Sequence, residues 1–272
     1  MCGIAGMVFL SGSRVRDSEV TKAILRNLLI ESMVRGRSAT GVAFVSHSKA
    51  SVVKHNIDAR DFIRSDFYAE AEKKFIDGDD KAFGKPNIIL AHTRMPTKGS
   101  EKNRDNNHPI VSDKIIGVHN GNISNDDDLF KEYIKSSPYL FKRKGEVDTE
   151  IIFRMINHFR HTVSMPMYDA IEHTDKLLKG SYACALVDVS TPWLLWLFKD
   201  WSPINIIHYP EAGLVIFASS IIFIRRAVSG ADLGKEEEIQ YPQESCIAIN
   251  TLSNKITNFD FEVPATRTVG YA

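Results

Sequence analysis

Residues 1–10 read MCGIAGMVFL, an almost unbroken apolar run that begins with a cysteine directly after Met1. The run has no basic leader and is about half the ~20 residues that a membrane-spanning helix needs, so it is neither a convincing signal peptide nor a span. A short apolar run of this kind is typical of a buried β-strand. We therefore expect a strand from Cys2 to Leu10 inside the protein.

The rest of the chain alternates helical spacing with short β-leaning runs. Helices are predicted over residues 18–33, from about 149 through 159, and over 167–178. Strands are predicted at 41–46, 88–93, 115–119, 182–189, 193–198, 204–208 and 214–218. The last four follow one another closely, which favours antiparallel pairing because parallel crossovers need a dozen or more residues. Helices grouped beside antiparallel sheets indicate an α+β layered domain.

Composition narrows the class of protein. Lys plus Arg and Asp plus Glu each total 34 of the 272 residues, so the charge gives no reason to expect nucleic acid or a membrane as partner. Cys2, Cys184 and Cys246 lie far apart, which argues against a disulfide scaffold and a metal site and favours a reducing, cytoplasmic location. No linker or repeat divides the chain, so we expect one domain over residues 2–272. The polar stretches 70–85 and 101–107 are expected to be exposed.

Cys2 is the candidate nucleophile. Removal of Met1 would leave a thiol and an α-amino group on one residue. Their ordinary pKa values of about 8.5 and about 7.7–8.0 allow the amine to take the thiol proton near neutral pH. The alternative is an incidental small residue on a buried strand, which is the better interpretation of a second-position cysteine taken alone. The segments that follow it reverse this preference.

Residues 2–6, CGIAG, resemble the start of the class II glutamine amidotransferases, a branch of the N-terminal-nucleophile (Ntn) hydrolases. The chain differs from the family at three positions. Ser38 stands where the usual residue is an acid, and Met95 and Lys98 stand where some relatives carry Trp and His. The resemblance covers roughly residues 2–225 and implies a four-layer αββα sandwich of two antiparallel sheets, with Cys2 at the end of a central strand. Further similar segments follow in the family's order: 35–41 (RGRSATG), 92–99 (HTRMPTKG), 107–109 (NHP), 119–121 (HNG) and 147–150 (VDTE).

The resemblance also implies roles for the residues that carry it. Cys2 would attack the glutamine side-chain amide, and the Asn120 amide with the Gly121 N–H would form the oxyanion hole. Substrate binding would fall to Arg94, Thr97, His108 and Asp148, with Arg35 in support. Arg94 would bind the α-carboxylate and Asp148 the α-ammonium group.

Other interpretations remain open when the same residues are taken singly. Arg94 could form a surface ion pair, Asn120 and Gly121 could form a hairpin turn, and Asp148 could be an ordinary N-cap.

The expected activity is hydrolysis of L-glutamine to glutamate and ammonia, with no cofactor and no metal. Family members usually carry a second domain that uses the ammonia. Since no acceptor domain is recognisable here, we expect a separately encoded synthase as partner. One alternative is an Ntn hydrolase of another amide, such as a γ-glutamyl compound. The other is a non-catalytic regulatory module that retains Met1.

Overall fold

A computed structural model of the chain describes residues 2–16 and 18–261. Met1, Asp17 and residues 262–272 lie outside the described residues, and with 262–272 the C-terminal end of the predicted domain. The helices are α1 (Ser18–Ser32), α2 (Ala59–Arg64), α3 (Asp66–Ala71), α4 (Asp126–Ser136), α5 (Thr149–His161), α6 (Met167–Leu177) and α7 (Ile221–Ala227), with a π-helical turn at Glu72–Ile76 and 3-10 turns at Arg104–Asn106 and Pro210–Ala212. The strands are β1 (Gly3–Phe9), β2 (Ala39–Val45), β3 (Ala50–His55), β4 (Ile88–Arg94), β5 (Ile110–Ser112), β6 (Ile115–Ile123), β7 (Gly180–Asp188), β8 (Leu194–Asp200), β9 (Asn205–Tyr209), β10 (Leu214–Ala218), β11 (Glu237–Ile239), β12 (Ser245–Asn250) and β13 (Ile256–Asp260).

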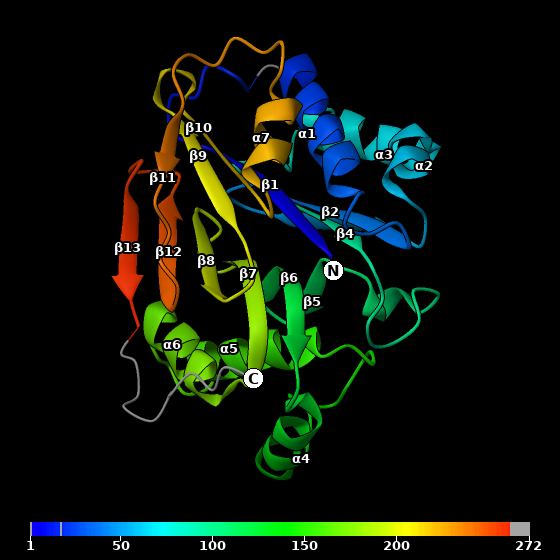
Figure 1. Cartoon of the computed structure of the whole chain (residues 1–272), viewed down its shortest axis with the longest axis vertical. Helices are drawn as coiled ribbons and strands as arrows, with labels where there is room; N and C mark the ends of the chain where they lie inside the picture. Colours follow the sequence, from blue (N-terminus) through cyan, green and yellow to red (C-terminus); the bar gives the residue numbers. More distant parts are fainter. Residues whose placement is uncertain (1, 17, 262–272) are drawn as a thin grey trace.

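The strands form two sheets that face each other (Figure 1). The first sheet has seven strands in the order β11-β9-β10-β1-β4-β2-β3, and the second has six in the order β13-β12-β8-β7-β6-β5. Neighbouring strands are antiparallel in both sheets. The short intervals between the strands are consistent with this pairing.

Strand β1 lies in the middle of the first sheet and is buried along its whole length. Its side chains alternate between two faces, as in any strand. Met7 and Phe9 pack in the core beneath α1 and α7, whereas Ile4 and Val8 pack in the core between the two sheets.

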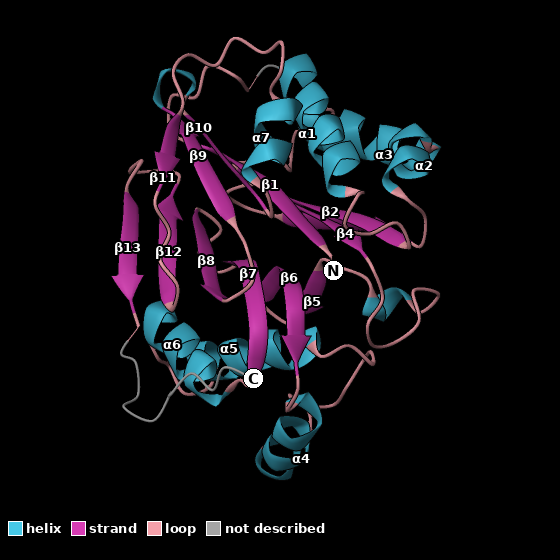
Figure 2. Cartoon of the chain, in the orientation of Figure 1, coloured by secondary structure: helices cyan, strands magenta, loops and turns pink. Residues whose placement is uncertain are grey.

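A third core lies on the far side of the second sheet, where α5 and α6 cover β6, β7 and β8 (Figure 2). Three apolar cores between four layers give the order helix, sheet, sheet, helix. The predicted αββα sandwich is therefore confirmed.

The predicted elements are found close to their expected bounds, with one difference that matters for the site. Strand β6 was expected to end at His119 but continues to Ile123, so Asn120 and Gly121 lie inside it. Residues after 225 extend both sheets, because β11 joins the first sheet and β12 and β13 join the second. None of the helices among the described residues has the length and apolar character that a membrane crossing requires.

The two polar stretches expected to be exposed are only partly so. Within 70–85, the side chains of Ile76, Phe83 and Glu72 are buried, and Glu72 forms an ion pair with the partly exposed Arg26. Within 101–107, Asn106 and Asn107 are buried. Low average hydropathy concealed these anchors, because one or two inward-facing side chains suffice to fix a polar segment.

Gly6 lies where β1 is most tightly enclosed. A β-carbon there would lie 2.1 Å from Phe217 Cζ and 2.5 Å from Ile89 O. We expect Gly6→Ala to lower the free energy of unfolding by about 3 kcal/mol through overpacking, as measured by urea denaturation. The control is Gly12→Ala, where a β-carbon meets nothing within 4 Å and only the positive φ of 81° is penalised, by about 1 kcal/mol. Equal losses in the two variants would contradict this explanation.

Candidate active site

Cys2 immediately precedes β1, and its half-buried thiol lies against the segment that follows β4. The Cys2 Sγ is 3.4 Å from both the N and the O of Met95. Arg35 Nε donates to Cys2 O at 2.7 Å. A β-carbon on Gly36 would lie 2.4 Å from Arg94 C, so the two backbones touch. Three segments that the sequence analysis singled out, starting at residues 2, 35 and 92, therefore meet at the thiol.

The environment of the thiol both opposes and supports its ionisation. Burial raises the pKa of Cys2, whereas the hydrogen bond with the Met95 backbone and the positive charge of Arg94 lower it. The negative charge of Asp148 acts in the opposite direction to Arg94. Because burial is the largest of these influences, the thiol needs a base to become a nucleophile.

Arg94 lies at the end of β4 and is buried. Its Nη2 donates to Lys98 O and Gly99 O, both at 2.8 Å, and its Nη1 donates to Asn107 Oδ1 at 2.9 Å. Two of the five guanidinium N–H donors thus hold residues 94–99, the Arg94 loop, in shape, and a third binds the Asn107 side chain, which leaves two for a ligand. The surface ion pair considered for Arg94 is wrong.

The Arg94 loop also contains Thr97 and Gly99. The Thr97 side chain is exposed on the outside of the loop. Gly99 has a φ of +74°, and a β-carbon there would lie 2.6 Å from Asn106 Nδ2. The loop therefore turns where only glycine fits without strain.

Asn120 and Gly121 belong to β6 of the second sheet, opposite Ala183 and Tyr182 of β7, so the hairpin-turn interpretation is wrong. Asn120 is 1% exposed, and neither its Oδ1 nor its Nδ2 has a hydrogen-bond partner among the described residues. A buried carboxamide without a partner is costly, which is typical of a group kept for a ligand. Gly121 has a φ of +142°, and a β-carbon there would lie 1.9 Å from Ser181 O.

Asp148 precedes α5 but does not cap it through its side chain. Instead its Oδ2 accepts from Ile123 N at 2.7 Å, at the end of β6. Asp148 is therefore the N-cap by position, but its side chain makes no capping hydrogen bond. The negative charge of Asp148 acts on both Cys2 and Arg94, which indicates that these three side chains are near one another.

Three buried histidines lie behind these residues, and only His108 was expected to take part in the site. His92 Nε2 donates to His119 O at 3.0 Å and joins β4 to β6 across the two sheets. Thr149 Oγ1 is 3.0 Å from His108 Nε2 and 2.8 Å from His119 Nδ1. His108 stacks on His92 with ring centroids 4.1 Å apart. His108 thus belongs to the support of the site and contacts the residue next to Asp148.

Lys54 of β3 is another supporting residue that the sequence did not reveal. Its Nζ donates to Asn107 O at 2.5 Å and to Pro109 O at 3.0 Å. Burial lowers its pKa to about 8. A lysine in an ordinary polar strand gives no signal of this role, because the carbonyls it serves are more than 50 residues away along the chain.

The two sheets between helices, with a cysteine at the start of a central strand and an unpartnered amide on the facing sheet, define an Ntn-type arrangement. A sequence model described as "Glutamine amidotransferase domain" matches residues 92–226. Among solved structures, glutamine phosphoribosylpyrophosphate amidotransferase from B. subtilis is similar over 97% of this chain and 50% of its own, with a TM-score of 0.66 and 17% identity. A glutamine aminotransferase class-II domain protein from Silicibacter pomeroyi is similar over 96% and 100%, with a TM-score of 0.56 and 13% identity.

Curated relatives include glutamine–fructose-6-phosphate aminotransferase [isomerizing] from two bacteria. The Listeria innocua protein is 30% identical over 211 residues, which is 76% of this chain and 30% of the relative. The Halalkalibacterium halodurans protein is 26% identical over 254 residues, 93% of this chain and 37% of the relative. The chain thus spans less than two fifths of the length of these relatives. It carries a class II glutamine amidotransferase domain.

Burial lowers the pKa of all three histidines, that of His92 to about 3. Below the ordinary pKa of about 6.5 each of these histidines takes up a proton in the unfolded chain but stays neutral in the folded protein. The free energy of unfolding therefore decreases as the pH is lowered, by about 1.4 kcal/mol per pH unit per histidine. We expect His92→Gln to reduce the slope of unfolding free energy against pH by about one proton between about pH 4 and 6. Urea midpoints at a series of pH values measure this. His173→Gln, on the exposed surface of α6, is the matched control, and a slope unchanged by the His92 substitution would refute the assignment.

Proposed function

We propose that this domain hydrolyses L-glutamine to L-glutamate and ammonia, with Cys2 as the nucleophile once Met1 has been removed. The observation that carries the proposal is that three groups act on the thiol while a fourth lies on the facing sheet. The Met95 backbone contacts it, the charges of Arg94 and Asp148 act on it, and Asn120 faces the same intersheet region with an unpartnered amide. Glutamine supplies a partner for each of these groups.

The proposed reaction begins with a proton transfer. The α-amino group of Cys2 takes the thiol proton, which overcomes the burial that raises the pKa of the thiol. The thiolate attacks the side-chain amide carbon, and Asn120 Nδ2 with the Gly121 N–H stabilise the oxyanion. The C–N bond then breaks, and the ammonium group of Cys2 returns its proton to the leaving nitrogen. Water hydrolyses the thioester, which gives glutamate and regenerates the thiol.

The proposed substrate orientation follows from the charges. The two remaining N–H donors of Arg94 bind the α-carboxylate, and the Asp148 carboxylate binds the α-ammonium group. Arg35 holds the backbone of Cys2 from behind. His108 positions Thr149, the residue after Asp148. Thr97, on the exposed side of the Arg94 loop, completes the entrance to the site.

We further propose that the ammonia passes to a synthase that is a separate subunit. The support is the similarity to enzymes whose names combine glutamine with an acceptor, fructose 6-phosphate or phosphoribosylpyrophosphate. Three free cysteines, two of them buried, suit a reducing compartment, and we propose a cytoplasmic location. Stimulation of glutamine hydrolysis on addition of a candidate synthase would support the partnership.

The nucleophile and the oxyanion hole are tested by two substitutions. We expect Cys2→Ala to abolish release of glutamate from glutamine, and Asn120→Ala to lower kcat by about 100-fold to 1,000-fold, because one oxyanion donor is lost. Asn122→Ala is the matched control, since Asn122 lies two residues further along β6 with an exposed side chain. Glutamate release by coupled assay measures all three.

The intact mass of the same preparation must be measured to show whether Met1 has been removed, because the mechanism requires a free amine on Cys2. Retention of Met1 throughout a native preparation would support the non-catalytic alternative. Activity in Cys2→Ala equal to that of the unchanged protein would refute the mechanism. Turnover of γ-glutamyl compounds but not of glutamine would favour the alternative of an Ntn hydrolase that acts on another amide.

The substrate contacts are tested by Asp148→Asn, which keeps an oxygen for Ile123 N but removes the charge. We expect kcat/KM for glutamine to fall about 10-fold to 100-fold, mainly through KM, because a charge-assisted contact to the α-ammonium group is lost. The control is Asp128→Asn on the exposed surface of α4. Steady-state kinetics measure both parameters, and an unchanged KM for glutamine in Asp148→Asn would exclude the proposed contact with the α-ammonium group.

A further inference from the structure

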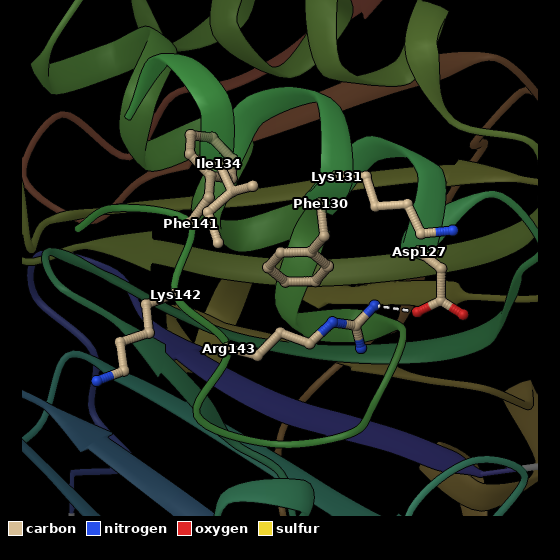
Figure 3. A pocket seen from close by; sticks show the side chains of 7 residues that line it. All are labelled: Asp127, Phe130, Lys131, Ile134, Phe141, Lys142 and Arg143. Atoms are coloured by element: carbon tan, nitrogen blue, oxygen red, sulfur yellow. Dashed lines mark hydrogen bonds and ion pairs between the residues drawn. The ribbon is translucent and has the colours of Figure 1, made fainter. Parts of the chain in front are cut away.

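A pocket of about 410 Å³ lies between α4 and the segment that follows it (Figure 3). Helix α4 lies at the end of the molecule away from the first sheet (Figure 1). Its apolar side chains are Phe130, Ile134 and Phe141. Ile134 is 41% exposed, whereas the two phenylalanines are buried. The volume falls within the range of small-molecule sites.

Three cationic side chains, Lys131, Lys142 and Arg143, and one carboxylate, Asp127, line this pocket. Lys131 is paired with Asp128, and Arg143 with Asp126 and Asp127. Arg143 lies over the Phe130 ring, with its guanidinium carbon 4.0 Å from the ring centroid (Figure 3). Lys142 has no ion pair or hydrogen bond through its side chain within the described part of the chain. An apolar base beside Lys142 and the Arg143 guanidinium fits an anion attached to an apolar body.

The pocket is connected to the Arg94 loop by ion pairs. Arg143 Nη2 is 2.9 Å from Asp126 Oδ2, and Lys98 Nζ is 2.6 Å from the same oxygen. The Asp126 side chain is 5% exposed, so these contacts are poorly screened by solvent. Asp127 repeats the pattern more weakly, with both cations in contact and 63% exposure.

Lys98 brings this ion-pair network to the candidate active site. Its backbone oxygen accepts from Arg94 Nη2 at 2.8 Å, so the residue that reaches Asp126 through its side chain also fixes the guanidinium of Arg94. A perturbation of Arg143 at the pocket can therefore alter the Arg94 loop through two ion pairs and one hydrogen bond.

We propose that this pocket is an effector site for a small apolar anion, an aromatic carboxylate or sulfonate in chemical class, and that its occupancy is transmitted to the Arg94 loop through Arg143, Asp126 and Lys98. The effect on catalysis rests on the proposed function; binding and transmission do not. An anion beside Arg143 competes with Asp126 for that guanidinium. Asp126, neutralised less by Arg143, then holds Lys98 more firmly, which stabilises the Arg94 loop.

Binding is tested with 1-anilinonaphthalene-8-sulfonate, an aromatic sulfonate whose fluorescence rises in apolar surroundings. The full chain is expected to bind it saturably. We expect Ile134→Glu, which places a negative charge at the apolar base, and Lys142→Gln each to weaken binding about tenfold. Lys135→Gln, on the same helix but outside the pocket, is the matched control. Absence of saturable binding, or equal binding by Ile134→Glu when its thermal unfolding matches that of the unchanged protein, would overturn the proposal.

Transmission is tested by hydrogen exchange of the backbone amides at residues 95–99. Saturating probe is expected to slow exchange there, and Lys98→Met is expected to bind the probe while losing this slowing. Unchanged exchange with the probe bound would overturn transmission. Where glutamine is hydrolysed, KM is expected to fall about fivefold with the probe bound. Slowed exchange in a protein without glutaminase activity would refute the proposed function and leave this inference standing.

Discussion

Strand β1 is hydrogen-bonded on both edges and covered on both faces, and this enclosure determines the rest of the architecture. A strand with apolar side chains on both faces must have a layer on each side. Helices α1 and α7 cover one face and the second sheet covers the other. The second sheet presents its own outer face and therefore requires α5 and α6. The four layers thus follow from the burial of both faces of β1, the strand that begins after Cys2.

The same enclosure places Cys2 at the point where the two sheets meet. Since β1 pairs with β4, the end of β4 and its Arg94 loop lie beside the thiol. The bond from His92 to His119 O then holds β6, with Asn120, opposite β4. The candidate site therefore lies at a junction of two sheets, with Cys2 and Arg94 at the ends of β1 and β4 and Asn120 inside the paired strand β6.

Much of the fold could be predicted from the sequence because its signals are local. Apolar runs located the strands, helical spacing located α1, α5 and α6, and short intervals indicated antiparallel pairing. Failures occurred where a long-range contact outweighs local composition. The residues around Glu72 give no indication of its ion pair with Arg26, which lies 46 residues away along the chain. Similarly, Asn120-Gly121 has the local character of a turn but is held in β6 by pairing with β7.

The sequence could name candidate site residues but not the hydrogen bonds among them. The ordered segments predicted Cys2, Arg94, Asn120 and Asp148 as members of the site, and in the structure the charges of Arg94 and Asp148 act on the Cys2 thiol. It could not be foreseen that Arg94 uses two donors on its own loop and one on Asn107, or that His92 bonds to His119 O, because hydrogen bonds depend on orientation in space. The same holds for Lys98, whose ion pairs with Asp126 and Asp127 required the position of α4.

The contact between Gly36 and the backbone of Arg94 and Met95 divides the neighbourhood of the thiol into positions of very different mutational tolerance. Any side chain at Gly36 displaces the main chain of Arg94 and Met95, and Met95 N contacts the Cys2 thiol. The side chains of Met95 and Thr97 point outward and are exposed, although the Met95 backbone contacts the thiol. Substitutions at the outer rim can therefore change the surface that the domain presents there, while the arrangement of main-chain atoms around the thiol tolerates no added side chain at Gly36.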